Sequence, residues 1–280
     1  MENVIMGGLL FGTAGIPHST PGKSAVRAVE CVAELGLGCM EIEFVRGVDM
    51  KEDVAVEVAK TASDHDIKLS VHAPYYINLN AKEPEKIKAS KARIFHSARI
   101  ASICGAQSVV VHTAFFMGDP VETAYPKIKQ NLKDTLEMLD QEGIEITVRP
   151  EVMGKSSQFG TVDEVIRLCS ELESTAPCID FAHNHALRGD MNTYDEFADV
   201  LNRVESALGR SALDDMHIHC SGIKYGPKGE LKHLFLEESD FNYKELLQTL
   251  KDFDVKGLLI CESPDPEPDA LLLQMYYNNL

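Results

Sequence analysis

Histidines and carboxylates that could bind divalent metal ions recur along this chain directly after short apolar runs. These candidate ligands are His72, His112, Glu151, Asp180, His183, His217, His219, Glu230, His233 and Glu262. A single histidine after a strand is usually an ordinary hydrogen-bonding residue. Six of the ten histidines of the chain fall in this one set, however, and that coincidence indicates a shared site. Imidazole and carboxylate ligands without thiolate favour zinc or manganese over magnesium or an iron–sulfur cluster.

The cysteines do not form a recognisable metal or disulfide motif. The chain has seven, an odd number, and they are scattered singly without C-x-x-C spacing: Cys31, Cys39, Cys104, Cys169, Cys178, Cys220 and Cys261. This pattern is typical of reduced thiols in a cytosolic protein. Cys220 and Cys261 are next to candidate ligands, but side chains alternate along a strand, so we expect both in the core.

Short apolar runs alternate with amphipathic helical stretches along the whole chain. The predicted strands are Leu9–Gly12, Cys39–Phe44, Lys68–His72, Ser108–His112, Glu145–Arg149, Cys178–Phe181, Met216–Cys220 and Gly257–Cys261. The predicted helices lie near 22–36, 51–65, 84–104, 121–141, 161–174, 193–208, 241–252 and 268–277. Eight strand–helix units predict a single-domain (β/α)8 TIM barrel over residues 1–280. An open doubly wound sheet is the alternative, but the chain has no G-x-G-x-x-G or P-loop string.

The barrel prediction explains why the candidate ligands would meet. In such a barrel the C-terminal strand ends converge on one face, where active sites are built. His72, His112 and Glu151 follow three different predicted strands, so we expect their side chains to share a cavity with the remaining candidates.

Composition limits the classes of function. The net charge of −17 argues against a protein that coats nucleic acid with a basic surface, but not against an enzyme that touches a few phosphates near bound cations. Apolar runs are too short to span a bilayer, and the N-terminus has no basic region typical of a signal peptide. We therefore expect a cytoplasmic monomer that does not bind membranes.

The string HAPYYINLN at 72–80 resembles the endonuclease IV family of apurinic/apyrimidinic endonucleases. The resemblance continues in order through VVVHTA, PEVMGKSSQFG, CIDFAHNHA, MHIHCSGIKYGPKGELKHL and LLICESP, which together cover most of the chain. It implies a barrel with two or three Zn²⁺ ions, with Mn²⁺ as an alternative. The implied activity is cleavage of duplex DNA on the 5′ side of an abasic site in base excision repair.

The resemblance also implies a role for each ligand. His72, His112 and Glu151 would hold the first ion, and Glu151 would bridge to a second ion held by Asp180, a histidine of the seventh strand and Glu262. His183, His233 and an acid near Glu230 would hold the third. Glu151 and Glu262 are the predicted catalytic carboxylates.

Two departures from the family pattern leave alternatives open. The family has D-x-H at the third ion, whereas this chain has Leu231 at the acid position and Glu230 one residue earlier. At the seventh strand the family has H-L-N-D-S and this chain has H-I-H-C-S. The match favours His217 as the ligand, with His219 as the alternative.

Three residues are candidates for contacting DNA. Tyr75 occupies the tyrosine position of the HAPY string, Arg46 follows the second predicted strand, and Lys155 lies in the loop after Glu151. By resemblance, Tyr75 and Arg46 would act where an abasic sugar turns out of the duplex. Lys155 could contact phosphate.

A second interpretation needs fewer ligands. The barrel also resembles sugar isomerases and epimerases of the xylose-isomerase type, some of which bind one manganese-class ion. Their chemistry would require Glu151, Asp180, His217 and Glu262, and the strong acidity favours it. It leaves His72, His112 and His233 without a role, so it ranks second. A non-enzymatic, metal-stabilised binding protein ranks third.

Overall fold

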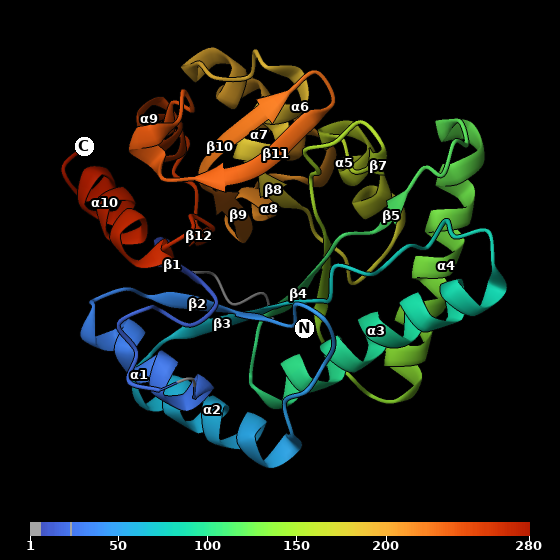
Figure 1. The fold of residues 1–280 in the computed structure, drawn as a ribbon, viewed down its shortest axis with the longest axis horizontal. Helices are drawn as coiled ribbons and strands as arrows, with labels where there is room; N and C mark the ends of the chain where they lie inside the picture. The colour runs from blue at the N-terminus through green and yellow to red at the C-terminus, as the bar shows by residue number, and fades with distance from the viewer. Residues whose placement is uncertain (1–6, 23) are drawn as a thin grey trace.

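A computed structural model describes residues 7–22 and 24–280, and its centre is a barrel of parallel strands (Figure 1). The barrel strands are β1 (Leu9–Ala14), β2 (Cys39–Glu43), β3 (Lys68–His72), β4 (Ser108–Val111), β6 (Thr147–Pro150), β8 (Cys178–Asp180), β9 (Met216–Cys220) and β12 (Gly257–Cys261). Their order in the sheet is β6-β4-β3-β2-β1-β12-β9-β8. Parallel bridges Val148↔Thr175 and Glu151↔Cys178 join its two ends. The predicted (β/α)8 TIM barrel is confirmed.

Helices surround the barrel, as Figure 1 shows for the pairs α1–α2 and α3–α4. The long helices are α1 (Ala25–Glu34), α2 (Glu52–Asp64), α3 (Pro84–Ile103), α4 (Val121–Gln141), α5 (Val162–Glu171), α7 (Tyr194–Leu208), α9 (Tyr243–Asp252) and α10 (Pro266–Asn278). Each corresponds to a predicted helix. The first predicted helix, near 22–36, includes residue 23, which lies outside the described residues. Residues 1–6 lie outside them as well.

Alternation along each strand separates the core from the site. In β9 the residues Met216, Ile218 and Cys220 pack in the main hydrophobic core, while His217 and His219 contact the Glu41 carboxylate inside the barrel. This is the two-residue period of a strand whose one face meets helices and whose other face lines the barrel. Cys220 and Cys261 both belong to the main core, as expected.

Several short elements were not predicted from the sequence, and all of them except α8 lie at the barrel mouth. They are α6 (Phe181–Arg188), α8 (Arg210–Leu213), η1 (Leu236–Glu238), the hairpin β10 (Gly222–Gly226)–β11 (Gly229–Leu234) and the pair β5 (Ala114–Phe115)–β7 (Gln158–Phe159). Phe181, predicted as the end of a strand, instead begins α6. The reason is Asp180, whose Oδ1 accepts the His183 N–H at 2.7 Å and so caps the helix directly after the strand.

No helix among the described residues is long and apolar enough to cross a membrane.

Candidate metal centre

The structure brings most of the predicted ligands together at the C-terminal ends of the barrel strands. Three groups have one ligand atom per residue within 4.8 Å of the others: His72, His112 and Glu151; Glu151, Asp180, His183 and Glu262; and His183, Glu230 and His233. Glu151 joins the first group to the second, and His183 joins the second to the third. The three groups therefore form one continuous centre.

The first group is built around one carboxylate oxygen. Glu151 Oε2 lies 2.8 Å from Nε2 of His112 and 3.1 Å from Nε2 of His72. The other nitrogen of His72, Nδ1, donates to the Ala73 carbonyl oxygen at 2.7 Å. That hydrogen bond fixes the ring and turns Nε2 toward Glu151, as backbone carbonyls commonly do for metal-binding histidines.

The same orientation recurs in two more rings. Nδ1 of His183 donates to the Val152 carbonyl at 3.1 Å, and Nδ1 of His233 donates to the Glu262 carbonyl at 2.8 Å. Their Nε2 atoms are 3.4 Å apart. Two imidazole nitrogens at this distance, each with its other nitrogen held by a backbone carbonyl, match the geometry of a shared cation.

The second group contains buried oxygens without hydrogen-bond partners among the described residues. They are Oε2 of Glu262 and Oδ2 of Asp180, although the latter lies 3.0 Å from Nδ1 of His183. A buried carboxylate oxygen without a partner is costly, and a bound cation removes that cost. The donor chemistry of the centre, imidazole nitrogen and carboxylate oxygen, therefore fits a zinc- or manganese-class ion.

The third group depends on a β-bulge in the β10–β11 hairpin, drawn in orange in Figure 1. Ile223 pairs with His233 and Tyr225 pairs with Glu230, with a register shift between Lys224 and Tyr225. Leu231 is consequently the extra residue, and it is 62% exposed. The bulge places Glu230, rather than Leu231, on the same face as His233.

Two glycines allow the loop after β6 to reach this hairpin. Gly229 has φ +98°, and a Cβ there would lie 2.0 Å from the Gly154 carbonyl oxygen. A Cβ at Gly154 would lie 2.9 Å from the Glu230 Cβ and 3.0 Å from the His183 ring. The resulting backbone contact includes the hydrogen bond from Glu230 N–H to the Gly154 carbonyl at 2.8 Å. Glycine at both positions is therefore required to hold Glu230 beside His183.

Charge at the centre shifts the pKa values of its groups. Burial lowers the pKa of His72, but Glu43 and Glu151 outweigh it and raise the value to about 10. In the same way, Asp180 and Glu151 overcome burial and raise the pKa of His183 to about 10. Burial raises the pKa of Glu262 to about 8, whereas His112 holds that of Glu151 well below its usual range despite burial. The metal-free centre thus retains protons on imidazoles that a cation would displace.

The two histidines of β9 lie at different depths. His219 Nδ1 is 3.4 Å from both Glu151 Oε1 and Glu262 Oε1, so His219 reaches the centre. His217 lies two residues earlier, where its Nε2 is 2.9 Å from Glu41. The sequence match favoured His217 as the ligand beside Glu151, and the geometry favours its alternative, His219.

Two acids in the site were not identified from the sequence. Glu41 is fully buried in β2, and Oε1 and Oε2 lie 2.9 Å from the imidazoles of His219 and His217. Glu43, two residues on, accepts a hydrogen bond from the Tyr75 hydroxyl at 3.2 Å. Two carboxylates inside the apolar string CMEIEF were the available signal, because acids are almost never buried without a partner.

A cavity of about 410 Å³ opens over the centre. Tyr75 and Lys155 line it, together with Glu151, Glu230 and Glu262. The Tyr75 ring lies 5.3 Å from the rings of both His72 and His112. Arg46 is exposed in the loop after β2 and is not among the lining residues.

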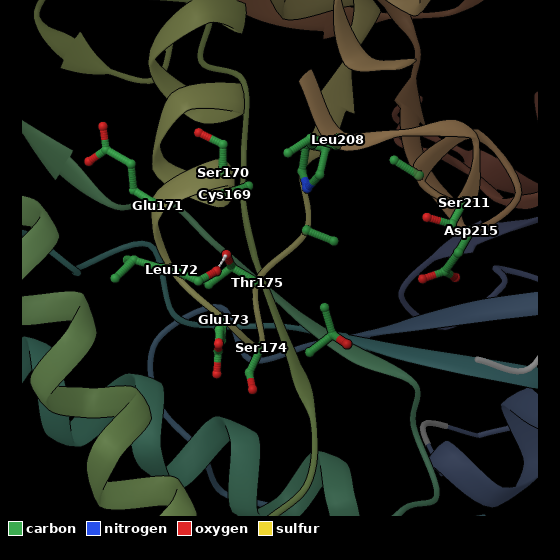
Figure 2. A pocket seen from close by; sticks show the side chains of 14 residues that line it. Cys169, Ser170, Glu171, Leu172, Glu173, Ser174, Thr175, Leu208, Ser211 and Asp215 are labelled. Atoms are coloured by element: carbon green, nitrogen blue, oxygen red, sulfur yellow. Dashed lines mark hydrogen bonds between the residues drawn. The ribbon is translucent and has the colours of Figure 1, made fainter. Parts of the chain in front are cut away.

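A larger cavity, about 590 Å³, lies at the opposite end of the barrel and is shown in Figure 2. Its lining residues include no histidine. Two of its three acids have basic partners, since Glu171 pairs with Lys129 and Asp215 with Arg149, both at 2.7 Å. This end of a (β/α)8 barrel is the one associated with stability rather than catalysis.

Two known proteins match most of the chain in sequence. Over 273 residues the chain is 46% identical to the uncharacterized protein MJ0133 of Methanocaldococcus jannaschii, covering 97% of this chain and 98% of that protein. Over 200 residues it is 25% identical to the probable endonuclease 4 of Mycoplasma pneumoniae, covering 69% of this chain and 67% of that protein.

Solved structures show the same fold. Endonuclease IV from Thermus thermophilus superposes with a TM-score of 0.74 at 19% identity, covering 97% of this chain and all of the other. A D-tagatose 3-epimerase-like protein superposes with a TM-score of 0.73 at 17% identity, covering 96% of both chains. The model of the family described as xylose isomerase-like TIM barrel matches residues 29–275. The chain belongs to the xylose isomerase-like TIM barrel family.

Proposed function

We propose that this protein is a metal-dependent endonuclease that hydrolyses the phosphodiester bond 5′ to abasic sites in duplex DNA, as part of base excision repair. The observation that carries the proposal is the continuous centre of three ligand groups, joined through Glu151 and His183. A one-ion enzyme needs only one of these groups. Relatedness to probable endonuclease 4 supports the same activity.

The residues of the centre have distinct tasks in this proposal. Glu151 would bridge two ions, since its two oxygens face different groups: Oε2 lies 2.8 Å from His112 Nε2, and Oε1 lies 3.4 Å from His219 Nδ1. Zinc-class ions held by these residues would supply the positive charge that phosphodiester hydrolysis needs, lowering the pKa of a water and stabilising the phosphate and the leaving oxygen. Glu262, beside Glu151 on the same face, is the second catalytic carboxylate.

The rim of the cavity would hold the DNA. Tyr75, 40% exposed, offers a ring face and hydroxyl at the mouth, and the Lys155 ammonium lies 3.3 Å from Glu230 Oε2. Lys155 would contact a phosphate that approaches the third group. Arg46, in the exposed loop after β2, would insert into the duplex. We further propose that the protein acts as a cytoplasmic monomer with zinc as its metal and manganese as a substitute.

The test is incision of an end-labelled duplex that carries one abasic analogue. Metal-replete protein should cut on the 5′ side of the analogue, leaving a 3′-hydroxyl. A chelator should abolish cutting, and added Zn²⁺ or Mn²⁺ should restore it. A cut on the 3′ side, or cutting that is insensitive to chelation, would contradict the proposal.

One observation favours a single-metal sugar isomerase or epimerase as the second candidate. His219 Nδ1 lies 3.4 Å from both Glu151 and Glu262, and Asp180 pairs with His219 across β8 and β9. These four residues alone would complete a one-ion site. The set does not use His72, His112 or His233, which is why it ranks second.

A further inference from the structure

Below the centre, inside the barrel, lies a second cluster of metal-ligating side chains. Cys178 of β8 pairs with His217 of β9, and one ligand atom each of Cys178, His217 and His219 lies within 4.8 Å of the others. We call these three residues the lower site. Each is at most 1% exposed. Asp180 and Glu262 belong to the group above, and His219, which also lies within 4.8 Å of Glu262, connects the two clusters.

The nitrogens of the lower site lack hydrogen bonds. Nδ1 and Nε2 of His217, and both nitrogens of His219, are buried without a hydrogen-bond partner among the described residues. Each ring has one nitrogen only 2.9 Å from a Glu41 oxygen, but the alignment there is not that of a hydrogen bond. An imidazole nitrogen buried without a well-aligned hydrogen bond is costly even beside a carboxylate, and a cation between the two rings would remove that cost.

The charge and ligand types around this cluster suit a thiophilic cation. The Glu41 carboxylate is fully buried beside both imidazoles, and its Oε2 accepts a hydrogen bond from Ser70 at 2.7 Å, which fixes its position. A thiolate from Cys178 and the Glu41 carboxylate would together balance a divalent ion. Thiolate with two imidazoles is a ligand set that zinc and cobalt accept and that magnesium and calcium do not.

We propose that Cys178, His217 and His219 bind a further zinc-class ion. Cys178 and His217 lie one residue pair deeper in the barrel than Asp180 and His219, and His219 would be shared between this ion and the centre at the mouth. This ion has a sulfur ligand, which the ligand groups at the mouth do not provide. Its role is structural, because the site is closed to solvent and the cavity over the centre is not lined by Cys178 or His217. A closed site of this kind takes up its ion as the chain folds.

Cobalt(II) distinguishes this proposal from a metal-free cluster. Protein refolded with excess Co²⁺ should show thiolate-to-cobalt charge-transfer absorption in the near ultraviolet. Cys178→Ser should remove that absorption and lower the metal content by about one ion per chain, since a serine hydroxyl is a poor substitute for thiolate. Cys220→Ser is the matched control, because Cys220 is in the same pair of strands but packs in the outer core. The charge-transfer absorption of the Cys220→Ser protein should match that of the unmodified protein.

X-ray absorption at the cobalt edge keeps the test valid if Cys178→Ser fails to fold. The unmodified protein should show a sulfur neighbour at about 2.3 Å. Absence of the charge-transfer band and of the sulfur neighbour from fully loaded protein would overturn the proposal, leaving Glu41 as an ion-pair partner of the two histidines. Persistence of the band in folded Cys178→Ser would overturn it as well. Neither result depends on whether the protein incises DNA, so failure here is distinct from failure of the proposed function.

Discussion

Glu230 and His233 project from the same face of the β10–β11 hairpin although they are three positions apart. In a regular strand, residues at odd separations point to opposite faces. The bulge at Leu231 shifts the phase, so that the Glu230 carboxylate lies 3.7 Å from His183 Nε2 while His233 lies beside the same ring. The bulge thus brings the Glu230 carboxylate close to His183 and His233, although Glu230 is one residue earlier than the acid of the D-x-H pattern.

This relationship predicts different effects for two adjacent substitutions. Glu230→Gln should weaken the third ion site by at least roughly tenfold, because the carboxylate charge is lost next to His183. Leu231→Gln, the matched control, should leave metal content unchanged because Leu231 is exposed. Metal titration with each variant measures the difference. Equal affinities in the two variants would show that Glu230 is not a ligand.

Glu151→Gln should affect more than one ion. Glu151 is the residue common to the first two groups, so loss of its charge should reduce activity or metal affinity at least roughly tenfold. Metal content and incision rate should be measured on the same preparation. Full metal content together with full activity would show that Glu151 does not bridge.

The metal-free protein should become less stable as pH rises. Unfolded histidine has a pKa near 6.5, and the folded values for His72 and His183 are raised to about 10. Between these values the folded chain binds more protons than the unfolded chain, so the free energy of unfolding falls with rising pH. Urea unfolding of chelated protein at about pH 6.5 and about pH 9.5 measures this effect. Constant or increasing stability over that interval would contradict the assignment of these charges.

Binding to DNA should depend on salt only modestly. The net charge is −17, so few basic side chains can contact phosphate. Between about 50 and 200 mM salt, affinity for an uncleavable abasic duplex should fall by less than about a thousandfold. In a plot of log affinity against log salt concentration, Lys155→Ala should make the slope shallower by about one unit, because one phosphate contact is lost. Lys60→Ala, on the exposed side of α2, should leave the slope unchanged. A steeper dependence for the unmodified protein would indicate a broad basic surface that the sequence lacks.

The regular part of the fold was predictable from the sequence. The alternation of strands and helices predicted the barrel. The barrel brings the C-terminal strand ends together, and His72, His112, Glu151 and Glu262 lie on that face as expected. Each of these residues ends a strand or follows one directly, so its position depends on the strand alone.

The irregular parts of the site were not predictable in the same way. The side chain of Glu230 is positioned by a bulge and by contact between Gly154 and Gly229, which come from distant segments. The choice between His217 and His219 depends on how deep β9 sits relative to β8, and a motif match carries no information on depth. The role of Glu41 does not follow from the sequence because its partners are two histidines on a strand far away in the sequence.

The central claim is that the centre cuts DNA, and one assay tests it most directly. A single metal-replete preparation is incubated with an end-labelled duplex containing one abasic analogue and, in parallel, with a panel of ketoses. The account predicts incision that leaves a 3′-hydroxyl and a 5′-deoxyribose phosphate, with no change in any ketose. Epimerisation of a ketose without incision at any metal load would contradict it and assign the barrel to sugar chemistry.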